Sequence, residues 1–169
     1  RCFAKLGYAM CTISMDEAGM RPAELEKSGA DLAYIMPSHQ FPMGMVMPMK
    51  RRMQLLAWAS RESGRYLIED DYDSEFRYKG RPIPALQGND TEGKVIYLGT
   101  FSRAIAPSIR ISYMVLPETL LPAYEENGRC FSATVSKTDQ KILEEFMRSG
   151  AFERHLNPVS YTHLPLPTI

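Results

Sequence analysis

Two short runs of polar side chains follow apolar stretches of this sequence, and both could contact a ligand. In the first run, "EDDY", Asp70 and Tyr72 come directly after an apolar stretch. The second run, "GTFSRAIAPSIR", offers the hydroxyls of Thr100 and Ser102 and the guanidinium of Arg110. A carboxylate buried at a strand end needs a cation or a hydrogen-bond donor as its partner. Two hydroxyls beside a planar guanidinium suit a phosphate dianion.

A single ligand could satisfy both runs. A protonated pyridinium nitrogen would pair with Asp70, and Tyr72, two residues further on, could hydrogen-bond a neighbouring ring oxygen. Pyridoxal 5'-phosphate carries this ring together with the phosphate that the second run would bind. Two simpler interpretations stand beside this one. The letters "DYDS" also make a good solvated turn, and Thr, Ser and Arg after a strand can simply cap a loop.

Composition excludes several other classes of function. Lys and Arg number 20, as do Asp and Glu, so the net charge of zero argues against a dominant nucleic-acid or membrane surface. Any contact with DNA would therefore lie outside this stretch. Cys2, Cys11 and Cys130 lack ligand-like spacing, so we expect neither a disulfide framework nor a metal site, and a cytoplasmic location. No apolar run approaches the roughly 18 residues of a membrane span. The chain begins with Arg1, and we expect it to be an internal fragment.

The elements that must position these residues alternate between strand and helix. Apolar runs of strand length are expected at residues 9–15, 31–37, 66–70, 94–101 and 110–117, and helices at 21–29, 48–64, 118–128 and 137–156. Short continuous apolar runs separated by a helix predict an α/β fold with a buried, mostly parallel sheet. Ligands of such sheets bind beyond the carboxyl ends of the strands, where both polar runs fall. In the helix at 48–64 we expect Met49, Met53 and Leu56 to face the core.

Residues 157–169 belong to neither pattern, because the sequence "NP" is expected to break the preceding helix and three prolines occur without periodicity. We expect an irregular tail here. One interpretation is a native disordered tail. The other, which we favour, is an extension foreign to the protein, since the letters resemble translated adapter sequence.

Five blocks of the chain, in order from Gly7 to Leu156, resemble a known family. These blocks are "YIMPSHQFPMG", "RRMQLLAWA", "LIEDDYDSEFRYKGRPIPALQG", "VIYLGTFSRAIAPSIRISYMVLP" and "SGAFERHL". Together they resemble the fold-type I, class I/II aminotransferase-like domain of the MocR subgroup of GntR-type transcription regulators. The resemblance implies that residues 1–156 form part of the large pyridoxal-phosphate-binding domain. It also implies an upstream winged-helix DNA-binding domain and a C-terminal small domain, both outside this chain.

The resemblance also implies roles for individual residues. Asp70 falls where the family places the acid that pairs with the pyridine nitrogen, and Tyr72 where it places the donor to the ring's phenolic oxygen. The phosphate-binding stretch of the family falls on Thr100, Ser102 and Arg110. The letters "FPMG" take the place of the Asn-Pro-x-Gly turn of ordinary aminotransferases, so that Phe41 replaces their ring-contacting asparagine. His39 or Gln40 is the candidate substitute.

Arg103 departs from the family pattern, which reads "GTFSK" and uses that lysine as the Schiff-base residue and proton shuttle. An arginine side chain stays protonated and is a poor nucleophile, so as written the chain should not transaminate. Lys94 and Lys79 are poorly placed to replace the lysine. Two explanations stand: a single-base error in the codon, or a drift to non-covalent binding in which Arg103 pairs with the phosphate or an anionic effector.

The expected function is therefore effector sensing in a cytoplasmic GntR/MocR-type transcription regulator. The cofactor is pyridoxal phosphate, bound non-covalently or lost, and the effector is an amino acid or amine. The resemblance implies a homodimer, and DNA would be bound only through the upstream domain. The alternative is part of a stand-alone class I/II amino acid aminotransferase. A third reading is a truncated piece with no independent function.

Overall fold

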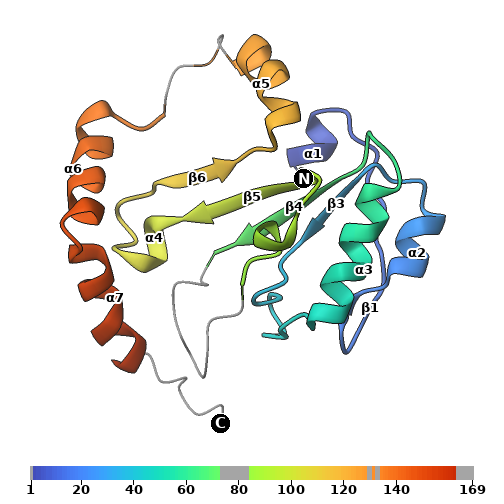
Figure 1. Cartoon of the computed structure of the whole chain (residues 1–169), viewed down its shortest axis with the longest axis horizontal. Helices are drawn as coiled ribbons and strands as arrows, with labels where there is room; N and C mark the ends of the chain where they lie inside the picture. The colour runs from blue at the N-terminus through green and yellow to red at the C-terminus, as the bar shows by residue number, and fades with distance from the viewer. Residues whose placement is uncertain (1, 73–83, 129–130, 132–133, 163–169) are drawn as a thin grey trace.

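A four-stranded mixed sheet forms the centre of the fold in a computed structural model of the chain. The structure describes the backbone of residues 2–72, 84–128, 131 and 134–162. Within these ranges it describes the side chains of residues 3 to 156. The strands are β3 (Leu32–Ile35), β4 (Tyr66–Asp71), β5 (Val95–Thr100) and β6 (Ser112–Val115), and they lie side by side in that order (Figure 1). Strands β3, β4 and β5 are parallel, and β6 runs antiparallel to β5. The expected α/β class with a mostly parallel sheet is confirmed.

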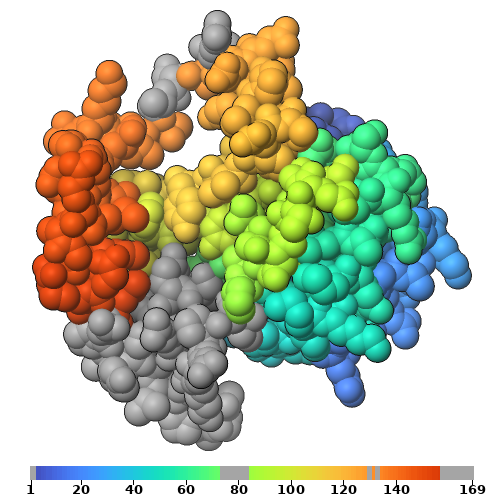
Figure 2. Space-filling view, in the orientation of Figure 1, coloured from blue at the N-terminus to red at the C-terminus, as the bar shows by residue number. Residues whose placement is uncertain are grey.

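Helices and short turns surround this sheet. Near the N-terminus lie α1 (Cys2–Lys5), the hairpin strands β1 (Met15–Asp16) and β2 (Gly19–Met20), α2 (Pro22–Lys27) and α3 (Met49–Ser60). After β4 follow the 3-10 turns η1 (Gln87–Asn89) and η2 (Glu118–Leu120), and the helices α4 (Phe101–Ala104), α5 (Leu121–Gly128), α6 (Lys137–Arg148) and α7 (Ala151–Thr162). Helices α6 and α7 lie on the opposite side of the molecule from α2 and α3 (Figures 1 and 2). None of the helices in the described ranges is both long and apolar enough to span a bilayer.

The main core lies between α3 and the sheet. Leu55, Trp58 and Ala59 of α3 are buried together with Leu67 of β4 and Val95 of β5. The side chains of a strand alternate between its two faces, so Leu67 faces α3 and Ile68 faces the other side of the sheet. Burial of this apolar face holds α3 against β4.

The expected Met-rich core face of α3 is wrong in part. Leu56 is buried as expected, but Met49 and Met53 are 43% and 38% exposed. The buried stripe instead begins at Arg52 and continues through Leu55 to Ala59, a spacing of three to four residues. The helix is apolar on more than one side, so the sequence pattern did not determine which side faces the sheet.

Other boundaries also differ from the expectation. The strand expected at residues 9–15 is absent except for Met15, because residues 8–11 and 13 line an apolar cavity over β3 instead of pairing in the main sheet. The helix expected at 137–156 is divided at Gly150, whose φ of 67° ends α6. Helix α7 then continues through Pro158 to Thr162, where we expected an irregular tail. A proline removes one backbone hydrogen bond but does not force a helix to end. Residues 163–169 lie outside the described range.

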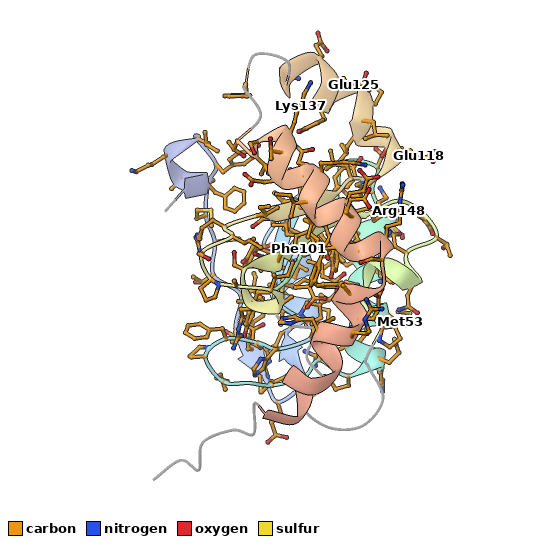
Figure 3. All side chains as sticks on the ribbon, turned by 90° about the vertical axis from the view of Figure 1, so that its left-hand side faces the viewer. Met53, Phe101, Glu118, Glu125, Lys137 and Arg148 are labelled. Carbon is orange, nitrogen blue, oxygen red and sulfur yellow. The ribbon has the colours of Figure 1, made fainter. Side chains whose placement is uncertain are left out.

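The C-terminal helices pack beside β6 through aromatic rings. The ring centroids of Phe101 and Phe152 are 6.1 Å apart, as are those of Phe146 and Phe152. Figure 3 shows α6 and α7 in front of the sheet, with Phe101 behind them. These contacts join α4, directly after β5, to helices α6 and α7.

Candidate functional site

The residues singled out from the sequence lie at one edge of the sheet. Strands β4 and β5 end at Asp71 and Thr100, and β3 ends at Ile35, shortly before His39. Because β6 is antiparallel, its first residues lie at the same edge, and Arg110 precedes them. The parallel arrangement therefore brings together segments from four parts of the chain (Figure 1).

Asp70 lies on the face of the sheet that α3 does not cover. Its carboxylate accepts a hydrogen bond from the hydroxyl of Tyr34, which lies on the neighbouring strand β3. Burial of the hydroxyl and the adjacent Asp70 carboxylate raise the pKa of Tyr34 above its ordinary value, so the phenol stays a donor. Tyr34 was not expected from the sequence. Tyr34 lies beside Asp70 because of the register in which β3 and β4 pair, and this register cannot be predicted from the hydrophobic pattern of each strand alone.

Tyr72 and His39 form a second contact at this edge. The hydroxyl of Tyr72 donates to the backbone carbonyl of His39 at 3.0 Å, and the two rings stack with centroids 6.0 Å apart. Tyr72 thus ties the loop after β3 to the end of β4. Gln40 has a different part in the loop: its backbone pairs with Met45, and its side-chain amide donates to the carbonyl of Phe41 at 3.4 Å. His39 and Tyr72 are therefore brought together, and Gln40 makes contacts within its own loop.

The second polar run forms a compact turn between β5 and β6. The hydroxyl oxygen of Thr100 accepts from the backbone N–H of Ser102 and donates to the carbonyl of Ile111, each at 3.2 Å. This capping contact begins the short helix α4. Arg110 has a φ of 50°, a left-handed conformation that non-glycine residues rarely adopt. The turn thus holds three residues expected at a phosphate: Thr100, Ser102 and Arg110.

Arg103 links the two runs. Its guanidinium carbon lies 5.5 Å from the centroid of the Tyr72 ring, so the side chain reaches from the end of β5 to the end of β4. Such a cation–π contact at an exposed position contributes about 0.5–1 kcal/mol. Lys94 cannot take over the position, because it precedes β5 at the opposite edge and its Nζ donates to the carbonyls of Glu62 and Ser63 at 2.9 and 3.0 Å. Lys79 lies outside the described residues.

Two buried carboxylates lie beneath the site on the α3 face. Glu69, with 0% exposure, accepts from the backbone N–H groups of Leu86 and Gln87 at 2.7 and 2.8 Å. Burial raises the pKa of Glu69 despite these two bonds. Asp71 accepts from the hydroxyl of Tyr97 at 2.8 Å. Burial and then this carboxylate raise the pKa of Tyr97. The sequence "EDD" shows three acidic residues in a row, but it does not indicate that Glu69 and Asp71 point into the interior.

This donor set fits a phosphorylated pyridine ring in part. Asp70 presents a carboxylate at the strand end, and the hydroxyls of Thr100 and Ser102 lie with Arg110 on the neighbouring turn. The guanidinium of Arg103 is a fork of hydrogen-bond donors and not a nucleophile. The arrangement can therefore bind an anionic aromatic ligand but offers no amine at residue 103 for covalent attachment.

The chain has the fold of the large domain of a fold-type I aminotransferase. The kynurenine aminotransferase of Pyrococcus horikoshii, solved in complex with PMP, superposes with a TM-score of 0.80 and is 30% identical, over 89% of this chain and 39% of that one. No family model matches the chain.

Relatives of the chain include both MocR-type HTH transcription regulators and an aromatic-amino-acid aminotransferase of Thermococcus litoralis, which is 31% identical over 162 residues. The HTH-type transcriptional regulator YhdI of Bacillus subtilis is 47% identical over 145 residues, which is 86% of this chain and 31% of that protein. The probable rhizopine catabolism regulatory protein MocR of Rhizobium meliloti is 35% identical over 150 residues, 89% of this chain and 30% of that protein. The expected resemblance is confirmed, and the chain spans less than a third of these two regulators.

Proposed function

We propose that this chain is the effector-sensing, aminotransferase-like part of a GntR/MocR-type transcription regulator, and that it binds pyridoxal phosphate without a covalent bond. The position of Arg103 is the observation that carries the proposal. By the family resemblance Arg103 falls where the Schiff-base lysine is expected, and its guanidinium carbon lies 5.5 Å from the centroid of the Tyr72 ring. The site therefore has a permanent cation where a catalytic amine would be needed.

Each residue at the edge has a part in this proposal. Asp70 holds the ring nitrogen, with Tyr34 orienting its carboxylate. The hydroxyl of Tyr72 is positioned by the carbonyl of His39, to which it donates its one proton, and would turn that proton to the ring oxygen of the ligand. Gln40 takes no part in this contact. The turn with Thr100, Ser102 and Arg110 binds the phosphate, and Thr100 acts by shaping the turn, because its hydroxyl proton is donated to the carbonyl of Ile111. When bound, pyridoxal phosphate supplies an aldehyde and an electron-withdrawing ring to an amine effector.

Binding in place of turnover suits a sensor. A ligand that prefers one of two conformations shifts the equilibrium between them, and a second site then changes its affinity by linkage. In the proposed regulator that second site is a winged-helix domain upstream of this chain, and the effector is an amino acid or amine. A C-terminal small domain, a homodimer and a cytoplasmic location belong to the same proposal.

The exchange Arg103→Lys in the full-length protein tests the proposal. Borohydride should fix pyridoxal phosphate to the Arg103→Lys protein, with a gain in mass, and should leave the wild type unlabelled. The control is Arg61→Lys, the same exchange at a side chain that is 64% exposed and pairs with Glu26. This control should behave as the wild type.

Two results would contradict the proposal. If borohydride fixed the cofactor to the wild-type protein, the account of Arg103 would be wrong. If a folded Arg103→Lys protein bound no cofactor, the assignment of the site would be wrong. Rereading the gene across codon 103 would separate a genuine arginine from an error.

A stand-alone aminotransferase is the second candidate, and the structural match to a kynurenine aminotransferase favours it. Under this proposal the chain would belong to an enzyme that acts on amino acids. A coding sequence for a basic winged helix upstream of the chain would favour the regulator. A start codon directly before the domain, together with amino-group transfer by the Arg103→Lys protein, would favour the enzyme.

A further inference from the structure

Arg52 is a buried cation that the proposed binding site does not use directly. It lies on α3 with 0% exposure, and its charge interacts with the buried carboxylates of Glu69 and Asp71. Removing a guanidinium from water costs several kcal/mol unless its donors are satisfied. The contacts of its donors therefore show what this buried charge does.

Two of these contacts close the base of one loop. The Nε atom of Arg52 donates to the carbonyl of Met47 at 3.0 Å, and Nη2 donates to the carbonyl of Pro37 at 2.8 Å. The backbone N–H of Met47 also donates to the carbonyl of Pro37, at 2.9 Å. Residues 38–46 lie between these two ends, and we call them the His39 loop. Arg52 thus holds both ends of the His39 loop against α3.

A third contact reaches the chain that returns after β4. The Nη1 atom of Arg52 donates to the carbonyl of Pro84 at 2.7 Å. Next to Pro84, the carboxylate of Glu69 accepts from the N–H groups of Leu86 and Gln87. Arg52 and Glu69 therefore join α3, the His39 loop, β4 and the segment at 84–87. Only a planar fork of donors can contact three carbonyls in this arrangement, so lysine is not an equivalent residue.

The His39 loop in turn supports Tyr72, whose hydroxyl donates to the carbonyl of His39 at 3.0 Å. We propose that Arg52 is a positioning residue: it holds the His39 loop where the carbonyl of His39 can accept the hydrogen bond from Tyr72. Its loss should therefore affect binding of the pyridine ring near Tyr72 and leave binding of the phosphate at the turn of Thr100, Ser102 and Arg110 unchanged. This inference rests on the proposed function, because it assigns a support to the same site. The phosphate-side turn lies between β5 and β6 and makes none of the contacts of Arg52 given above.

Arg51 provides a matched control on the same helix. Its side chain is 14% exposed and bonds to Asp16 at 2.8 Å and to the carbonyls of Gly19 and Met20 at 3.0 and 2.7 Å. It therefore makes a similar number of contacts, but with the β1–β2 hairpin. Its replacement should disturb packing to a comparable degree without moving the His39 loop.

The test is to measure, by equilibrium dialysis, the affinity of the full-length protein for two probes, pyridoxal 5'-phosphate and inorganic phosphate. In Arg52→Gln the affinity for pyridoxal phosphate should fall roughly tenfold to a hundredfold, as expected when a binding group is displaced by about 1 Å. The affinity for inorganic phosphate should stay unchanged. Arg52→Lys should lose less than Arg52→Gln, and Arg51→Gln should bind both probes as the wild type does.

Several results would overturn the inference. An equal loss for both probes in Arg52→Gln would indicate general damage, and an equal loss of pyridoxal phosphate in Arg51→Gln would show that the effect is not specific to the His39 loop. If Arg52→Gln does not fold, the double variant Arg52→Met with Glu69→Gln removes Arg52 together with one of its two buried acidic neighbours, leaves Asp71 bonded to Tyr97, and should fold with the same selective loss. Full affinity in that variant would contradict the inference. A wild type that binds no pyridoxal phosphate would overturn the proposed function and this inference together, whereas normal binding by Arg52→Gln would overturn the inference alone.

Discussion

Replacing Gly99 with alanine would test the packing that places the phosphate-side turn. A Cβ atom at Gly99 would lie 2.3 Å from Cζ and 2.5 Å from the hydroxyl oxygen of Tyr113, well inside van der Waals contact. The two residues are partners in the register of β5 and β6. The Tyr113 ring also packs against Phe101 with centroids 5.1 Å apart. The ring cannot move away freely, so β5 must shift just before Thr100.

The size of the effect follows from these contacts. Inserting a methyl group into such a close approach costs about 1–3 kcal/mol of stability. In a Tyr113→Ala background the overlap is absent, and alanine should be favoured over glycine in the strand by about 0.5–1 kcal/mol. The coupling free energy between the two positions is therefore about 1.5–4 kcal/mol. Gly99→Ala alone should also weaken binding of inorganic phosphate, because Thr100 is displaced.

Native-state hydrogen exchange of the β5 amides in the full-length protein measures the local opening free energy directly. The four proteins of the cycle are the wild type, Gly99→Ala, Tyr113→Ala and the double variant. Gly64→Ala is the matched control, since a Cβ there would meet no atom within 4 Å and should change the opening free energy little. Equal effects of Gly99→Ala in both backgrounds would refute the reasoning, because the cost would then not come from the Tyr113 ring.

Two further predictions concern the acids of β4. Asp70→Asn keeps the shape of the side chain but removes its charge, so the affinity for pyridoxal phosphate should fall roughly tenfold to a hundredfold in equilibrium dialysis; unchanged affinity would remove Asp70 from the site. Burial raises the pKa of Glu69, so its contribution to stability is present below the ordinary value of 4.5 and is lost as the pH rises through the folded value. Urea unfolding from pH 4 upward should therefore show the wild type losing stability relative to Glu69→Gln, and a relative gain would contradict this.

Much of the scaffold could be predicted from the sequence because its signals are local. The apolar runs before Asp70 and Thr100 are strands, and the helix at 49–60 lies between β3 and the first of them, as expected for an α/β unit. Pro22 begins α2, which ends shortly before Gly29. The strand expected at 9–15 was predicted wrongly, because its apolar residues line a cavity. A short apolar run does not show whether its backbone pairs with a neighbouring strand or its side chains only cover an apolar surface.

The candidate site was predictable only in its residue types. Asp70, Tyr72 and Thr100 could be singled out because acids, phenols and hydroxyls after buried strands meet at one edge of a parallel sheet. The departure from the family pattern at Arg103 is a prediction from the family resemblance. The partners of these residues were not predictable. Tyr34 reaches Asp70 through the register of two strands that are far apart in the sequence.

The sequence by itself therefore determined the class of fold, the order of its strands along the chain and the chemical groups available at the carboxyl edge, since each depends on neighbouring residues. Tertiary structure alone decided which groups meet. It turned Glu69 and Asp71 inward and Asp70 outward, buried Arg52 beneath the His39 loop, and laid Arg103 over Tyr72. These choices depend on how distant segments pack, because a buried charge is tolerated only where the folded chain brings carbonyls, amides or an opposite charge to it.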